Sequence, residues 1–163
     1  MRLIKPILTQ VAEEFAKSVI DGIAKNIREK DVLGYGPMNN TGRAADSMGY
    51  TYDGRKLVIY SNWSFFWTLE TGRGPGKMPP IDPILDWVQQ RGIYSPDVSP
   101  ASMAFLIARK IGREGSLLYR SGGNSGIITE YTSADFIQRN LTDRARDELI
   151  RRTIETLQSE IAA

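Results

Sequence analysis

The 163-residue chain contains no cysteine and no histidine. Their absence excludes disulfides, thiol nucleophiles, histidine general bases and the common zinc and iron sites. An oxygen-only metal site would need clustered carboxylates, but the acidic residues are scattered and no D-x-D-x-D-G calcium loop occurs. Asp82 and Asp86 are four residues apart, yet a helix dipole alone favours carboxylates near a helix N-terminus. We therefore expect no metal, no cofactor and no catalytic residues.

The chain also lacks a matching phosphate-binding motif, although "ETGRGPGKMPP" (residues 70–80) is glycine-rich and contains Gly-Lys. A P-loop would need glycine where Thr71 stands and a hydroxyl where Met78 stands. Pro75 removes a backbone N–H from a loop that binds phosphate through such groups. Serine motifs fail as well, since "GGNSG" is one residue short of the G-x-S-x-G elbow and no S-x-x-K occurs. A carboxylate enzyme would need a shared pocket that no spacing predicts, so we expect a protein that is not an enzyme.

Neither charge nor hydropathy indicates nucleic acid or a membrane as the main partner. The net charge of +2 is too small to argue for nucleic acid by itself. No apolar run approaches membrane-spanning length, and Glu13 and Glu14 interrupt the N-terminal region before a signal peptide could form. We expect a protein without membrane contact, kept in a cytosol-like compartment or in a particle assembled there.

Apolar periodicity predicts a long helix at each end of the chain. The first covers about residues 6–30, and either packing on its own domain or contact with a neighbouring subunit would explain its stripe. The second covers about residues 133–161. The stripes are Leu8, Val11, Phe15, Val19, Ile23 and Ile27 in the first helix, and Phe136, Leu141, Ala145, Leu149, Ile154, Leu157 and Ile161 in the second.

Residues 41–132 are expected to form an α+β core between these helices. "GYTYDGRKLVIYS" predicts a β-hairpin with a two-residue turn at Asp53 and Gly54. "PIDPILDWVQQRG" predicts a helix capped by Asp82 and ended by Gly92. "SPASMAFLIARKIGREG" predicts a helix that begins at Ser99 and is apolar on most sides, so we expect it to be central. "SLLYRSGGNSGIITEY" is consistent with a hairpin or an ordering loop.

The predicted fold is α+β: a small antiparallel β-sheet packed with long N- and C-terminal helices and two shorter central helices. The length of 163 residues favours a single domain.

Aromatic residues gather in "NWSFFWTLETG", just before the glycine-rich loop. Helical spacing places Trp63, Phe66 and Trp67 on adjoining positions, and Trp87 follows in the next predicted helix. Such residues are typical of a core, and tryptophan is also enriched at protein interfaces. Both interpretations remain open.

The order of these signals resembles a known family. A "TGR…S" turn (Thr41, Gly42, Arg43, Ser47) precedes the hairpin, and the aromatic segment, "GRGPGKMPP", "ILDWVQQRGI" and "AFLIARKIGREG" follow in that order. Over residues 41–115, and most specifically over residues 70–93, this succession resembles the neck or tail-completion proteins of tailed bacteriophages. That group includes minor tail protein Z and similar head–tail joining proteins. The chain departs from the family's commonest pattern at "SFFWTLE", where Tyr-Ala often precedes the glutamate.

The resemblance implies a structural virion protein of the head–tail interface or tail, made in the cytoplasm of the bacterial host. It implies a homo-oligomer, expected as a cyclic ring, with portal, connector or tail-tube proteins as partners. DNA would pass through the lumen without specific binding.

The glycine-rich loop is then a candidate subunit contact, because glycines and prolines together hold an extended shape at low entropy cost. A rigid connector with solvated cations is the alternative. The candidate contact residues are Gly72, Arg73, Gly74, Pro75, Gly76 and Lys77.

A DNA-interacting phage morphogenesis factor that is not retained as a ring is the second hypothesis. Four cations lie close together in the sequence against the single acid Glu114, a composition also typical of a solvated face. The cations are Arg109, Lys110, Arg113 and Arg120.

Overall fold

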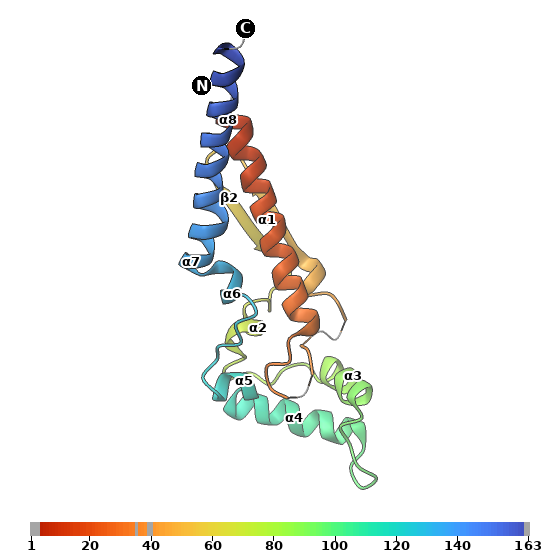
Figure 1. Cartoon of the computed structure of the whole chain (residues 1–163). Helices are drawn as coiled ribbons and strands as arrows, with labels where there is room; N and C mark the ends of the chain where they lie inside the picture. Colours follow the sequence, from red (N-terminus) through yellow and green to blue (C-terminus); the bar gives the residue numbers. More distant parts are fainter. Residues whose placement is uncertain (1–3, 35, 39–40, 162–163) are drawn as a thin grey trace.

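The computed structural model describes residues 4–34, 36–38 and 41–161, and Figure 1 shows their arrangement. The elements in chain order are α1 (Ile4–Glu29), η1 (Ala45–Ser47), β1 (Met48–Tyr52), β2 (Leu57–Ser61), α2 (Thr68–Thr71), α3 (Asp82–Arg91), α4 (Pro100–Glu114), α5 (Leu117–Arg120), α6 (Thr129–Thr132), α7 (Ala134–Ile137), η2 (Gln138–Asp143) and α8 (Arg144–Ile161). A two-stranded antiparallel sheet with long terminal helices and shorter central helices confirms the predicted α+β fold.

The core forms around α1, whose predicted apolar stripe is buried from Val11 to Ile27. The hairpin packs on α1, and so do the segments from α6 to η2. Phe15 lies among these neighbours, with its ring centroid 6.1 Å from that of Phe136. The stripe therefore packs within the chain, as the first of the two interpretations predicted.

The hairpin is confirmed, but its turn is longer than predicted. Tyr52 pairs with Leu57, which leaves four residues, 53–56, in the connection. The Asp53 carboxylate accepts hydrogen bonds from the backbone N–H groups of Arg55 and Lys56, each at 2.8 Å. With a two-residue turn, the N–H groups of Arg55 and Lys56 would belong to the second strand. Here they bind the Asp53 side chain instead, so the strand begins later.

The C-terminal helix is interrupted by a π-helical stretch, η2, between α7 and α8. Ser133 caps its start, where the hydroxyl oxygen accepts from the N–H of Phe136 at 3.2 Å. α8 runs antiparallel to α1 in Figure 1, and Arg144 pairs with Glu14 at 3.1 Å.

The predicted stripe of the C-terminal helix divides into two parts. Ala145 and Leu149 are half-buried, whereas Ile154, Leu157 and Ile161 are exposed. The rough stripe of the sequence is therefore not a single face in the structure. At 100° per residue, the exposed positions lie on a different face from Ala145 and Leu149.

α3 and α4 pack on each other, at the end of the molecule away from the C-terminus of α8 (Figure 1). Gly92 ends α3 in the left-handed conformation with φ +62°, and Ser99 caps α4 by accepting from the N–H of Ser102 at 3.2 Å, both as predicted. Asp82 was wrong as the N-cap of α3, because Ile81 occupies that position without a side-chain bond and Asp82 is already helical.

The expectation that α4 is central was wrong. Ala104 and Ala108 are its only buried residues, and Phe105 and Leu106 are each 43% exposed. α3 and the loop before it pack on one side of α4, where its small residues lie, whereas Phe105 and Leu106 face solvent.

The segment 116–131 is not a hairpin. It folds as α5, a turn and α6, and Ser116 caps α5 by accepting from the N–H of Tyr119. The backbone donors near residue 128 are bonded to a side chain rather than to a second strand.

Candidate interaction surfaces: the 72–80 loop and the cleft beside it

The buried carboxylate of Glu70 organises the region before the glycine-rich loop. It is 3% exposed, at the end of α2, and it holds the segment 125–129 through five donors. Oε1 accepts from Gly126 N at 3.0 Å and Thr129 Oγ1 at 2.7 Å, while Oε2 accepts from Ile128 N at 2.8 Å, Ser125 Oγ at 3.2 Å and Thr129 N at 3.4 Å. This number of donors to one carboxylate indicates that Glu70 is ionised in place.

Burial opposes the charge more strongly than any single bond favours it, but the hydrogen bonds together lower the pKa of Glu70 below its ordinary value of 4.5. The bond from Ile128 N contributes most, followed by the Thr129 hydroxyl. Because every donor belongs to one segment, an ionised Glu70 fixes that segment against α2.

The end of α1 holds the same segment from another side. Lys30 Nζ donates to the carbonyl of Gly126 at 3.1 Å and pairs with Glu130 at 3.2 Å. Asn26 donates to the same Glu130 carboxylate at 3.1 Å. The start of the loop is therefore tied through Glu70 to the core helix.

Gly72 begins the loop at a place where no side chain fits. It is buried, its φ is +72°, and an added Cβ would lie 2.3 Å from the backbone nitrogen of Tyr119. Positive φ is strained for other residues, and the close contact involves backbone that cannot move aside. Glycine is therefore required at position 72 by α5, not by the loop alone.

The loop is bonded along its length to the end of α4 and the start of α5. Arg73 N donates to the Ser116 hydroxyl at 2.9 Å, and Ser116 N donates to the Arg73 carbonyl at 2.7 Å. Gly76 N donates to the carbonyl of Gly112 at 2.8 Å. An added Cβ on Gly112 would lie 3.1 Å from Met78 Cα, so α4 and the loop approach closely.

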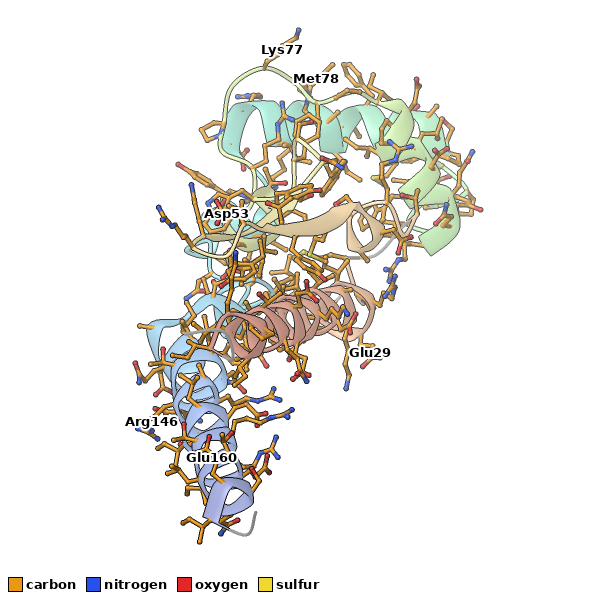
Figure 2. All side chains as sticks on the ribbon, turned by 90° about the horizontal axis from the view of Figure 1, so that it is seen from above. Glu29, Asp53, Lys77, Met78, Arg146 and Glu160 are labelled. Carbon is orange, nitrogen blue, oxygen red and sulfur yellow. The ribbon has the colours of Figure 1, made fainter. Side chains whose placement is uncertain are left out.

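The tip of the loop, residues 75–78, is exposed. Figure 2 shows Lys77 and Met78 at the outer edge of the molecule, with the Lys77 side chain directed away from it. Arg73 donates from Nη2 to the Lys77 carbonyl at 2.9 Å, inside the loop. The six candidate residues thus divide: Gly72, Arg73 and Gly74 are at least half-buried, and Pro75, Gly76 and Lys77 form most of the tip.

The four candidate aromatic residues also divide. Trp63 and Phe66 are half-buried and pack against the core, as the core interpretation predicted. Trp67 is 59% exposed, and Trp87 lines a cleft. Sequence reasoning did not single out Phe65, which is half-exposed and lines the same cleft, because helical spacing was assumed where residues 64–67 form turns.

The cleft has a volume of about 890 Å³ and lies between the α3–α4 pair, the aromatic segment and the segment that follows α1. Its apolar lining includes Phe65, Ile84, Trp87, Ile107 and Ile111. Among the described residues, its charged lining consists of the four cations Arg43, Arg73, Lys110 and Arg120 and the two acids Asp82 and Asp86.

The basic residues of α4 and α5 lie in different places. Lys110 and Arg120 line the cleft, and Arg120 also pairs with Glu114 at 3.4 Å. Arg109 lies with its guanidinium 6.0 Å from the centre of the Phe105 ring. The predicted patch is therefore divided between the cleft and the outer face of α4.

Within the described residues, no helix is long and apolar enough to cross a membrane, and no group of three or more carboxylates could hold a metal ion. No protein-family model matches the chain, and neither the curated proteins nor the solved structures compared with it gave a significant match.

Proposed function

We propose that the chain is a structural virion protein of a tailed bacteriophage, acting at the head–tail junction or tail as one subunit of an oligomeric ring or adaptor. The observation that carries the proposal is the exposed tip at residues 75–78 on a loop anchored by Glu70, Gly72 and Ser116. A surface that docks repeatedly on identical neighbours gains affinity when its shape is fixed before contact.

The resemblance over residues 41–115 supports the same proposal from the sequence. The partners would be further copies of this chain, expected in a cyclic ring, and the portal, connector or tail-tube proteins of the same particle. DNA would pass through the ring without specific binding, and the protein would have no enzymatic role.

Reversing the charge of the tip tests this proposal. Lys77→Glu is the clean variant, because Lys77 is exposed whereas Arg73 bonds within the loop. We expect the melting temperature of the purified variant to match that of the wild type, since exposed substitutions change stability by about 0.5 kcal/mol or less. We expect the infectious particle yield to fall at least tenfold, because like-charge or mismatched contacts at an interface cost several kcal/mol.

The matched control is Lys56→Glu, at another exposed lysine in the hairpin turn, which should leave both the melting temperature and the particle yield unchanged. A normal particle yield with Lys77→Glu would contradict a docking role for the tip. Absence of the wild-type chain from purified particles would contradict the virion function itself.

A further inference from the structure

The end of α8 carries a second apolar face with no covering element. Ile150, Ile154, Leu157 and Ile161 recur at four-, three- and four-residue steps, so they form one stripe along the helix. Their exposures are 52%, 49%, 53% and 86%, so about half or more of each side chain is open to solvent. We call these four residues the α8 stripe.

α8 also extends past the helix beside it. Arg144 pairs with Glu14, which fixes the register of the two antiparallel helices. Seventeen residues of α8 follow Arg144, whereas the described part of α1 has ten before Glu14. At about 1.5 Å per residue, α8 extends roughly 10 Å further, as Figure 1 shows. The end of α8 can therefore contact another molecule without disturbing the α1–α8 packing.

The charge of the last turn of α8 is negative. Over residues 150–161 the cations Arg151 and Arg152 balance Glu155 and Glu160, and Glu155 is paired with Arg151 at 2.8 Å. Beyond that pair, residues 156–161 contain Glu160 and no cation. The helix dipole adds partial negative charge at a C-terminus, and no basic residue lies in the last turn to offset it.

The cleft has the complementary properties. It is apolar inside, and its lining among the described residues has four cations against two acids, with one of the cations, Arg120, paired with Glu114 outside the lining. A helix end with an aliphatic face and an acidic last turn fits an apolar groove with a basic rim. The cleft and the end of α8 lie at opposite ends of the molecule in both views, so they cannot meet within one chain (Figures 1 and 2).

We infer that the end of α8 in one copy of the chain docks, through the α8 stripe, in the cleft of a second copy. Each copy then offers two different surfaces, an acidic apolar helix end and a basic apolar cleft. A contact between unlike surfaces is heterologous, and repeated contacts of this kind produce a closed ring or an open chain. The inference names the subunit contact of the proposed ring and rests on that function for its place in a particle.

Pairing of two α8 stripes on each other is the competing arrangement. It would produce an isologous dimer, in which the same patch is used twice, and would leave the cleft unoccupied. The docking of α8 in the cleft covers both exposed apolar surfaces with one contact and also brings opposite charges together.

Cysteine crosslinking of the purified chain tests the inference directly, because the natural sequence has no cysteine. The test variant combines Leu157→Cys on the α8 stripe with Ile84→Cys in the cleft, treated with an oxidant after the melting curve has confirmed folding. We expect a ladder of dimers, trimers and larger species, since each copy carries both halves of the contact. Phe65→Cys replaces Ile84→Cys if the latter lowers the melting temperature, because Phe65 is half-exposed.

The matched control replaces Leu157→Cys with Ser159→Cys, an exposed position half a turn away on the same helix. This control should crosslink at least tenfold less. Glu160→Lys in the test variant should lower the yield several-fold, because it places a cation beside the basic rim.

Three results would overturn the inference: equal crosslinking by the Ser159→Cys control, disulfide dimers from Leu157→Cys alone, or no crosslink in the folded test variant. A ladder in the purified chain together with its absence from particles would uphold this contact and contradict the virion function. If the chain is present in particles but the crosslink does not form, the virion function is upheld and this contact is contradicted.

Discussion

The buried carboxylate of Glu70 accepts the hydrogen bonds that residues 125–129 would make to a second strand in a hairpin. Its carboxylate receives five bonds from residues 125–129, and Glu70→Gln would place an amide N–H₂ opposite donors that need an acceptor. We expect this variant to lose about 2–5 kcal/mol of unfolding free energy, because bonds to charged groups are strong and the freed donors remain buried. Urea unfolding of the wild type and the variant at pH 7 measures this loss of free energy.

The effect of Glu70→Gln should depend on pH. The pKa of Glu70 is lowered in the folded chain below 4.5, so its stabilising contribution is complete above that pH and is lost as pH falls through the folded-state pKa. The stability difference between wild type and variant should therefore be largest near pH 6–7 and shrink in acid. Glu29→Gln, at an exposed carboxylate, is the control and should change stability by about 0.5 kcal/mol or less. A difference that stays constant with pH would contradict an ionised Glu70.

Gly22 lies in the middle of α1, and we expect Gly22→Ala to change stability in the direction opposite to that expected from helix propensity. Alanine in the middle of a helix is normally about 0.5–1 kcal/mol more favourable than glycine. An added Cβ at Gly22 would lie 2.1 Å from a ring carbon of Tyr131, so we expect Gly22→Ala to destabilise the chain by about 1–3 kcal/mol. In a Tyr131→Ala background the same change should be neutral or stabilising. A double-mutant cycle in urea checks the coupling, and additive effects would refute the contact.

At the scale of elements, α1 and α4 look alike in sequence and differ in packing. Phe15 on α1 is 5% exposed, and Phe105 on α4 is 43% exposed. Phe15→Ala should cost about 3–5 kcal/mol, while Phe105→Ala should cost about 1–2 kcal/mol because only about half of its side chain leaves solvent on folding. Comparison of the two variants by chemical denaturation gives the answer. Equal losses would mean that α4 is packed more tightly than its exposure indicates.

The elements that the sequence predicts well are those fixed by local chemistry. Ser99 caps α4 and Gly92 ends α3 because a hydroxyl acceptor and a left-handed conformation act within a few residues. The stripe of α1 is buried as its spacing predicted, because one long helix must place one face on a core. These features need no knowledge of what lies elsewhere in the chain.

The elements that the sequence predicts poorly depend on distant neighbours. The exposure of Phe105 follows from where α3 and the loop happen to lie, and the fold of segment 125–129 follows from a carboxylate 55 residues earlier. Glu70 in an aromatic stretch was the available signal for such a site, since a buried acid needs several donors. The division of the predicted loop into a buried start and an exposed tip could not be read from its glycines and prolines.

At the scale of the whole molecule, the chain places its candidate contact surfaces far apart. The tip and the cleft lie with α3 and α4, and the α8 stripe lies at the other end (Figures 1 and 2). Surfaces at opposite ends cannot contact each other within one copy, so a contact between them joins two copies head to tail, and repeated contacts of this kind give a ring or an open chain. This separation is compatible with the proposed ring, which rests on the resemblance to neck and tail-completion proteins.

The most direct measurement is cryo-electron microscopy of the purified tailed particle whose genome encodes the chain, combined with mass spectrometry of the same particles. From the proposed function we expect several copies of the chain per particle and a closed ring of density at the head–tail junction or tail into which the fold fits, with residues 75–78 against a neighbouring subunit. Infectious particles that lack the chain, or a neck and tail whose density is fully assigned to other proteins, would contradict it.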